Sequence, residues 1–544
     1  MAAERIQAAL FALLLSFAAG CGSEDSSTAA GAAPRSGSFG NAGSGSSVAP
    51  GGPNIGVGDS SDAGAPLPPE TEVDQSFRAP VATGQVLWSA NPDSGRVALI
   101  DAKTLQVRMT NAGFGPTYLA AVPSAPGTDS AIVINVGSHD ATWFTASATN
   151  IDAVTIPTHV GANAWSISAD GHFAIAWTDV TRIDGGAPDS VNGYSELTVI
   201  DLSASPPTST RLSVGFRPSE VVFDAAAAHA FAVVDEGISV LDLTGNPELS
   251  QLLTVGTADA AAHARDVNFA PDGSFAVVRV EGSSDVEIID LSRNERQVVD
   301  LGSSVTDLDL SPDGKTATAV LGDATPPQVV SFAVPKPSVD TSGLDCATLP
   351  GELVRSVTLA PNGDLALLYA NAVPSSHLTL LDTAPGAGHC GFRTLDLQGP
   401  VVGVFASPDS STAIVFQTPP AGSTKKGLFS IVPTEVMRAP RLVGTDAVPA
   451  EIAFGGAAPG KALVTVHDSH STVRGVYVIG LANLEQNFVS LSSEPLPGAT
   501  GIVAEANRGF VAQKHPEGRI TFIDLDTGVA QTLSGFEIAA RVVQ

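Results

Sequence analysis

Basic residues are scarce in this chain of 544 residues, with 27 Lys and Arg against 56 Asp and Glu and a formal net charge of −29. Because contacts to nucleic-acid phosphates need clustered Lys and Arg, we expect no nucleic-acid partner. The charge favours a solvated, soluble surface, and attraction for divalent cations is the alternative interpretation. Hydrophobic residues make up 43% of the chain, enough for a globular core.

The chain also lacks a long apolar run at its start. The run from Ile6 to Ala19 is too short for a transmembrane helix and ends in small residues, as export signals do. Residues 17–21, FAAGC, resemble the lipobox of bacterial lipoproteins, in which the cysteine is lipidated and becomes the mature N-terminus. The resemblance implies a signal peptide over 1–20 and an acyl chain such as palmitate on Cys21. An ordinary secretory signal with an incidental cysteine is the alternative.

Residues 21–80 lack apolar periodicity and are rich in Gly, Ser, Pro and Asp. Such a segment cannot bury enough surface to fold, so we expect a disordered tether. A flexible chain of this length spans roughly 40–45 Å. The anchor and tether together predict a protein of the bacterial cell envelope, held to a membrane on the periplasmic face or the cell surface.

Sustained helical periodicity is missing from residues 81–544, where short alternating segments are separated by turn signals, so we expect an all-β fold. Residues 264–302 contain four strand candidates in about forty residues, the size of one β-propeller blade. An Asp recurs at the end of the third strand, where its carboxylate can accept backbone N–H bonds of the next turn. Its occurrences are Asp101, Asp201, Asp242, Asp290, Asp382 and Asp524.

About ten such units fit between 85 and 544, more than the usual four to eight blades. One large ring is our prediction; misread weak units and two tandem propellers are the alternatives. The first unit, starting near Val86, lacks an innermost strand in this reading. The C-terminal residues 535–544, GFEIAARVVQ, would supply it and close the ring. We therefore expect deletion of 536–544 to destabilise the whole ring.

Two stretches carry a resemblance to a known family: LWSANPDSGRVALIDAKTLQV at 87–107 and LLYANAVPSSHLTLLD at 367–382. They look like the YVTN-type repeat of bacterial propellers, as found in surface-layer-like and lactonase-like proteins. The Tyr-Val-Thr-Asn signature itself is absent. The resemblance implies a propeller and says little about function.

Acidic side chains alternate along one expected innermost strand, at Asp307 and Asp309. One unit earlier the corresponding positions are Asp266 and Asn268. Innermost strands line the central channel, so these oxygens would lie close together and suit a hard cation such as Ca²⁺. The alternative is a hydrated polar channel wall.

After Cys21, two cysteines remain, Cys346 and Cys390. In an exported protein they favour one disulfide over a catalytic thiol pair. We expect both in third-to-fourth-strand loops on the same face, one blade apart.

The expected second-to-third-strand loops vary most in length, so we expect the binding face there. The long ones are 179–196, 371–377, 418–427 and 467–475, and neutral insertions are the alternative. The candidate binding residues in them are Asp179, Arg182, Asp184, Asp189, Lys425, Lys426, His467 and His470.

No local pattern resembles a Ser/His/Asp constellation. Four Trp are too few for the once-per-blade aromatic docking of quinone-dependent propeller enzymes. We therefore expect a monomeric, non-enzymatic binding or scaffold module for a protein or glycan partner. The alternatives are a lactonase-like or other hydrolytic propeller and a structural envelope protein.

Overall fold

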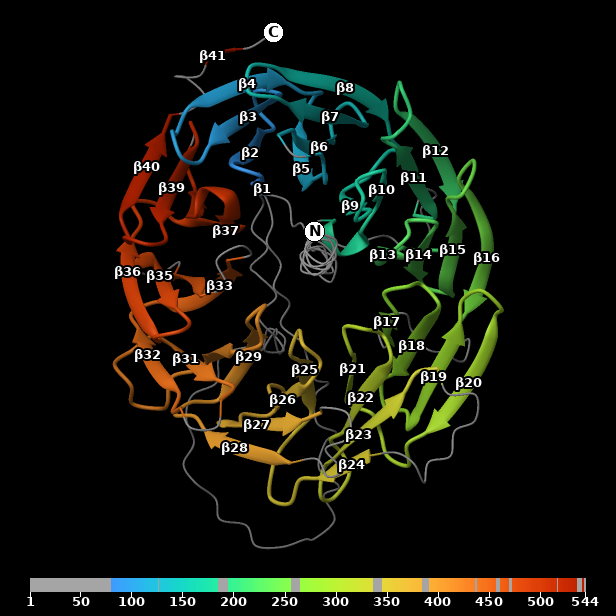
Figure 1. The fold of residues 1–544 in the computed structure, drawn as a ribbon, viewed down its shortest axis with the longest axis vertical. Helices are drawn as coiled ribbons and strands as arrows, with labels where there is room; N and C mark the ends of the chain where they lie inside the picture. The colour runs from blue at the N-terminus through green and yellow to red at the C-terminus, as the bar shows by residue number, and fades with distance from the viewer. Residues whose placement is uncertain are drawn as a thin grey trace, which may run out of the picture.

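A computed structural model describes residues 80–125, 127–183, 194–255, 265–335, 345–383, 391–435, 438–455, 460–468, 472–515, 517–535 and 541–542. These residues form ten four-stranded antiparallel sheets, with a fifth, parallel strand on the outer edge of the first. The sheets stand as blades around one ring (Figure 1). The predicted all-β propeller of about ten blades is thereby confirmed as one ring.

The blades are numbered in chain order, and in each the first strand is innermost. Blade 1 contains β1 (Val81–Thr83), β2 (Val86–Asn91), β3 (Arg96–Asp101) and β4 (Val107–Asn111). Blade 2 contains β5 (Pro116–Ala121), β6 (Asp129–Asn135), β7 (Asp140–Ala146) and β8 (Ile151–Pro157). Blade 3 contains β9 (Ala164–Ile167), β10 (Phe173–Trp177), β11 (Glu196–Asp201) and β12 (Thr208–Ser213). Blade 4 contains β13 (Glu220–Phe223), β14 (His229–Val234), β15 (Gly237–Asp242) and β16 (Glu248–Thr254). Blade 5 contains β17 (Arg265–Phe269), β18 (Phe275–Val280), β19 (Asp285–Asp290) and β20 (Glu295–Asp300).

The second half of the ring repeats this order. Blade 6 contains β21 (Asp307–Leu310), β22 (Thr316–Leu321), β23 (Gln328–Ala333) and β24 (Asp345–Thr348). Blade 7 contains β25 (Ser356–Leu359), β26 (Leu365–Tyr369), β27 (His377–Asp382) and β28 (Phe392–Asp396). Blade 8 contains β29 (Val401–Ala406), β30 (Thr412–Gln417), β31 (Gly427–Pro433) and β32 (Arg441–Thr445). Blade 9 contains β33 (Val448–Phe454), β34 (Lys461–His467), β35 (Arg474–Gly480) and β36 (Glu485–Ser490). Blade 10 contains β37 (Pro495–Val503), β38 (Arg508–Gln513), β39 (Arg519–Asp524) and β40 (Ala530–Ser534), and β41 (Arg541–Val542) follows.

Short 3-10 helices lie at η2 (Val180–Arg182) and η5 (Ala504–Ala506). Within the described ranges, no helix has the length and apolar character needed to cross a membrane.

The recurring Asp at the end of the third strand shapes the turn to the fourth strand. In blade 5, Asp290 Oδ1 accepts the backbone N–H groups of Ser292 (3.0 Å) and Arg293 (2.9 Å). Partial burial acts to raise the pKa of Asp290, but the hydrogen bond from the Ser292 hydroxyl and the two backbone bonds outweigh it and lower the pKa. Carboxylates at the same place in blades 1, 3, 4 and 10 make backbone bonds of this kind, so the predicted role is confirmed at Asp101, Asp201, Asp242, Asp290 and Asp524.

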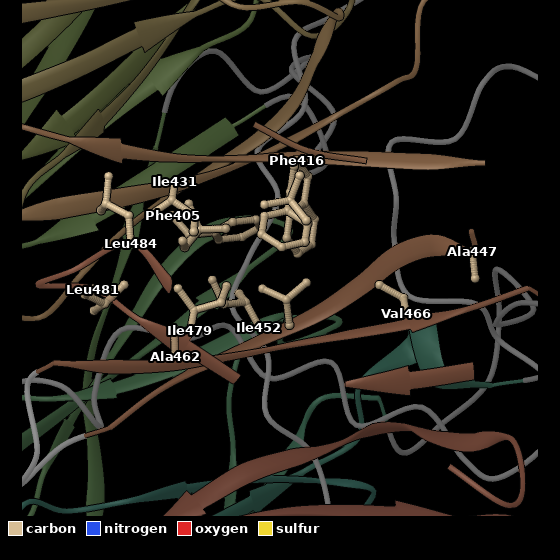
Figure 2. Packing of buried hydrophobic residues seen from close by; sticks show 14 residues of the cluster. Phe405, Phe416, Ile431, Ala447, Ile452, Ala462, Val466, Ile479, Leu481 and Leu484 are labelled. Atoms are coloured by element: carbon tan, nitrogen blue, oxygen red, sulfur yellow. The ribbon is translucent and has the colours of Figure 1, made fainter. Parts of the chain in front are cut away.

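The hydrophobic core lies between neighbouring blades. Figure 2 shows one such layer, in which Phe405 and Phe416 of blade 8 face Ile452 and Ile479 of blade 9. Burying a side chain of this size stabilises the fold by about 1.5–3 kcal/mol. Because each sheet contributes both faces to such layers, every blade depends on its two neighbours.

Ring closure differs from the prediction. The innermost strand of blade 1 is β1, which pairs with β2 in the register Val81↔Trp88, whereas β41 pairs in parallel with β4 at the outer edge. The prediction that the C-terminus supplies the innermost strand is therefore wrong. Strand β1 has only three residues and turns at Gly84 (φ 47°) without the Asp-Gly signal, so its pattern is too short to read from sequence. Blade 10 instead closes on blade 1 through a shared apolar cluster that includes Leu87 and Phe510.

Candidate functional site

One face of the ring carries both the second-to-third-strand loops, such as 136–139, and the connections between blades, such as 158–163; we call it the loop face. Strands alternate in direction, so these segments emerge on the same side. At several blades of the loop face an ion pair joins a loop to a connection and fastens the two together. These ion pairs are Arg217–Asp235 (2.6 Å), Arg355–Asp323 (2.6 Å), Lys425–Asp446 (2.6 Å) and Lys514–Glu494 (3.0 Å), and His377 Nδ1 at the start of β27 lies 2.7 Å from Glu352 Oε2.

Blade 2 presents apolar side chains at this face instead. Phe114 lies in the connection from blade 1, Val136 in the second-to-third-strand loop and Val160 in the connection to blade 3. Their exposed fractions are 72%, 40% and 65%. These three residues, which we call the apolar rim, contrast with exposed apolar residues such as Val298 and Phe488, which stand on outer strands.

The Phe114 backbone is fixed although its side chain is exposed. Its N–H donates to Ser138 Oγ (3.0 Å), and its carbonyl accepts the N–H of Gly137 (2.9 Å) and of Ser138 (3.2 Å). The ring lies so close over Gly137 that a Cβ there would clash with it. An exposed aromatic held in one position loses little conformational entropy when a partner covers it.

Beside the rim lies a cavity of about 350 Å³ between blades 2 and 3. Val136 and Val160 stand at its edge, and the fully buried residues Asn135, Thr158 and His159 form part of its wall. This volume is at the lower end of the range for small-ligand pockets, roughly 300–1,000 Å³. An apolar edge with a few polar groups inside is the usual composition of such pockets.

His159 is a neutral structural member of the cavity wall. Burial, aided by the charge of Arg211, lowers the pKa of His159 to about 4. Its Nδ1 lies 2.9 Å from Thr198 Oγ1 and its Nε2 lies 3.2 Å from Thr178 Oγ1. Both ring nitrogens are therefore engaged with hydroxyl groups of blade 3.

Two other polar groups of the wall are buried and have no hydrogen-bond partner within the described part of the chain. Asn135 Nδ2 donates to a carboxylate oxygen of Asp140 (2.6 Å) and to Thr142 Oγ1 (2.9 Å). Because a carboxylate accepts, the amide nitrogen must face Asp140, which fixes the orientation of the amide. Among the described residues, no group bonds Asn135 Oδ1 or Thr158 Oγ1. A buried polar atom left in this way costs about 1–3 kcal/mol, so its presence calls for an explanation.

Two of the predicted binding residues, Asp179 and Arg182, belong to this site. Asp179 begins η2 by accepting the N–H of Thr181 (2.8 Å), and its carboxylate pairs with Arg182 Nε at 2.9 Å. Arg182 lines the cavity and donates through Nη1 to the carbonyl of Asn163 (2.8 Å). Both side chains are buried, so Arg182 forms part of the wall, Asp179 fixes its guanidinium, and neither projects from the loop.

The remaining predicted residues of the binding loops do not join this cavity. Lys425 pairs with Asp446 on blade 8, and Lys426 donates its N–H to a carbonyl there. His467 is half-buried at the end of β34 in blade 9, where burial lowers its pKa. Blades 8 and 9 lie apart from blade 2, with blades 10 and 1 between blade 9 and blade 2 (Figure 1). Asp184, Asp189 and His470 lie outside the described residues.

The predicted calcium ligands form a contact between blades. Asp307 Oδ2 accepts the N–H of Val357 (2.7 Å), and Asp309 Oδ2 accepts the N–H of Leu359 (2.8 Å). Both amides belong to β25, the inner edge strand of blade 7, where no further strand pairs with them. The described part of the chain contains no group of three His, Cys, Asp or Glu side chains placed to hold a metal ion. These two carboxylates thus have a structural use that needs no cation.

The neighbouring pair from blade 5 is arranged in the same way. Asn268 Nδ2 donates to the carbonyl of Leu308 in blade 6 (3.2 Å) and to Asp266 Oδ2 (3.3 Å), and Asp266 lies 3.7 Å from Arg279 Nε.

Desolvation, followed by the charge of Asp307, raises the pKa of Asp309 well above its ordinary value, although part of its surface is exposed.

Cys346 lies inside the outer strand β24, paired with Val330, and not in the preceding loop as predicted. The reason is that β24 begins at Asp345, ahead of Cys346, whereas the prediction requires it to begin after Cys346. Cys21 and Cys390 lie outside the described residues, so lipidation and the disulfide remain predictions.

Comparison with known proteins defines no family: no family model and no curated protein matches the chain. Among solved structures it is similar to a eukaryotic initiation factor, with 14% identity, a TM-score of 0.47, and coverage of 76% of this chain and 96% of the other. It is also similar to the Cps50 (Swd1) β-propeller domain of Myceliophteria thermophila (12% identity, TM-score 0.32, 58% and 95% coverage). A third similar structure is apo AztD from Citrobacter koseri (14% identity, TM-score 0.38, 62% and 92% coverage). The class of protein that the fold itself defines is a ten-bladed β-propeller.

Proposed function

We propose that the protein is a lipid-anchored, extracytoplasmic β-propeller that binds a partner through the loop face at blade 2. The observation that carries the proposal is the apolar rim of Phe114, Val136 and Val160, of which Val136 and Val160 line the cavity. At blades 4, 6, 8 and 10 the same face carries ion pairs between a loop and a connection, and blade 2 differs from them in its apolar side chains. Apolar groups clustered beside a pocket favour binding because covering them removes apolar surface from water.

The composition of the rim favours a protein partner over a glycan. Its three side chains offer no hydrogen-bonding group, whereas a glycan surface is rich in hydroxyls. A rigid exposed aromatic such as Phe114 is typical of residues that carry most of the energy of a protein interface.

The proposed location of the protein in the cell envelope rests on the amino-acid sequence alone. The lipobox-like residues 17–21 and the tether over 21–80 support an anchor in the cell envelope. Mass spectrometry of the mature N-terminus tests this part separately: acylated Cys21 is expected, and an unmodified terminus at another residue would overturn it.

The buried histidine of the cavity wall gives no support to the hydrolytic alternative. A general base must be free to take a proton from the attacking group. His159 has both ring nitrogens bonded to Thr hydroxyls and a pKa of about 4, so it does not match that role.

Site-specific photo-crosslinking in intact cells tests the proposal. A photoreactive phenylalanine analogue at Phe114 keeps the aromatic ring, and the same analogue at Lys315 reports on the opposite face, where the side chain is 77% exposed. We expect one dominant crosslinked product from position 114 and none from 315. Equal labelling at both positions, or labelling at 315 alone, would contradict a binding face at blade 2.

A further inference from the structure

The chemistry of the cavity narrows the group that it accepts. Asn135 Oδ1 is an acceptor whose orientation is fixed by Asp140, and Thr158 Oγ1 is a hydroxyl that can accept. Both residues are fully buried, both line the cavity, and neither atom has a partner among the described residues. A guest hydroxyl would satisfy both, because its O–H can donate to Asn135 Oδ1 while its oxygen accepts from the hydroxyl of Thr158.

The charges of the wall favour an uncharged guest. The described lining contains no Asp, Glu or Lys, and its single Arg, Arg182, is balanced by Asp179 at 2.9 Å. A cationic guest would meet Arg182 without an opposing carboxylate on the cavity surface. An anionic guest would compete with Asp179 for the same guanidinium and would present acceptors to Asn135 Oδ1.

The apolar side chains at the opening of the cavity favour a guest with an apolar body. Val136 and Val160 border the opening, and Ile134 and Ala162 continue the apolar surface inside. A volume of about 350 Å³ suits a single aromatic ring or a short aliphatic chain and leaves no room for a large ligand.

We infer that the cavity between blades 2 and 3 binds an uncharged group with a small apolar body and a hydroxyl, which donates to Asn135 Oδ1 and accepts from the hydroxyl of Thr158. The inference rests on the proposed function, because it names what enters the pocket at the binding face. The group comes either from a side chain of the partner, such as a phenol, or from a free small molecule.

Two probes that differ only in the donor test the inference. p-Cresol has an apolar ring and a hydroxyl, and toluene has the same ring without it. We expect ligand-observed NMR titrations of the full-length protein to show p-cresol binding roughly tenfold more tightly than toluene, as expected for one or two hydrogen bonds to buried acceptors.

A conservative substitution shows whether Thr158 contributes to the preference for p-cresol over toluene. Thr158→Val keeps the shape and removes a hydroxyl that the described protein does not use, so the variant should fold normally. It should reduce the preference for p-cresol to about twofold, since one of the two hydrogen bonds to the guest hydroxyl is lost. Thr155→Val, on the exposed side of β8 in the same blade, is the matched control and should leave the preference unchanged.

The outcomes separate the inference from the proposed function. Equal affinity for the two probes, or a preference unaffected by Thr158→Val, overturns the inference even if crosslinking from Phe114 succeeds. If p-cresol binds as expected and blocks that crosslink, the natural guest is a partner side chain. If p-cresol binds as expected and the crosslink persists, the guest is a free small molecule.

Discussion

Removing the Asp307 carboxylate should loosen the contact between blades 6 and 7. The side chain is 1% exposed, and it accepts the N–H of Val357 at 2.7 Å and that of Leu308 at 2.9 Å. In Asp307→Ala the Val357 amide, on the inner edge of blade 7, loses this acceptor while remaining buried. A hydrogen bond to a charged acceptor contributes about 1.5–3 kcal/mol, so we expect a loss of roughly 3 kcal/mol in the free energy of unfolding.

The matched variant is Asp307→Asn, which keeps an acceptor oxygen at nearly the same position and should cost about 1 kcal/mol or less. Urea unfolding measures the global effect. Hydrogen exchange of a peptide covering β25 measures the local one and should become faster in the Ala variant only. Similar losses in both variants, or unchanged exchange at Val357, would refute the idea that this carboxylate joins the two blades.

Three further predictions concern the ring itself. Asp309 has a raised pKa in the folded protein, so folding favours its protonated form. The free energy of unfolding of the wild type should therefore fall as pH rises from 3.8 through the pKa of the folded state, and Asp309→Asn should remove this fall. A difference in the free energy of unfolding between wild type and variant that stays constant between pH 4 and pH 8 would contradict this prediction. Gly237 has φ +149° and lies against the carbonyl of Leu253, so Gly237→Ala should cost more than about 2 kcal/mol, whereas Gly245→Ala, with open space around it, should cost under about 1 kcal/mol. Deleting 536–544 should change the melting temperature by only a few degrees because blade 1 keeps four strands of its own; loss of cooperative melting would show that β41 closes the ring.

The blade pattern could be predicted because it is local. The turn after Asp290 is determined by bonds to residues two and three positions later, and strand alternation is visible within a single unit. The closure of the ring was missed because it depends on pairing between distant segments and on β1, which has only three residues.

The candidate site was only partly predictable. Loop length pointed to the loop face, where Arg182 lies. The polar wall, however, joins Asn135, Thr158 and Arg182 from three separate segments, and nothing in their local sequence shows their burial. Phe114 carried a weak signal, since a bulky aromatic between Gly113 and Gly115 in a connection has no strand to pack in. The alternation of Asp307 and Asp309 is visible in the sequence, but the role of these two carboxylates depends on amides of the next blade.

The central claim, that a partner binds at the apolar rim, is tested most directly by placing a charge there. Val160→Asp and Val298→Asp both alter valines that are more than half exposed, the first at the rim and the second on the outer strand β20. The measurement is the affinity of each variant for the partner recovered by crosslinking from Phe114. We predict a loss of at least about tenfold for Val160→Asp and none for Val298→Asp. Equal affinities in the two variants would contradict the account.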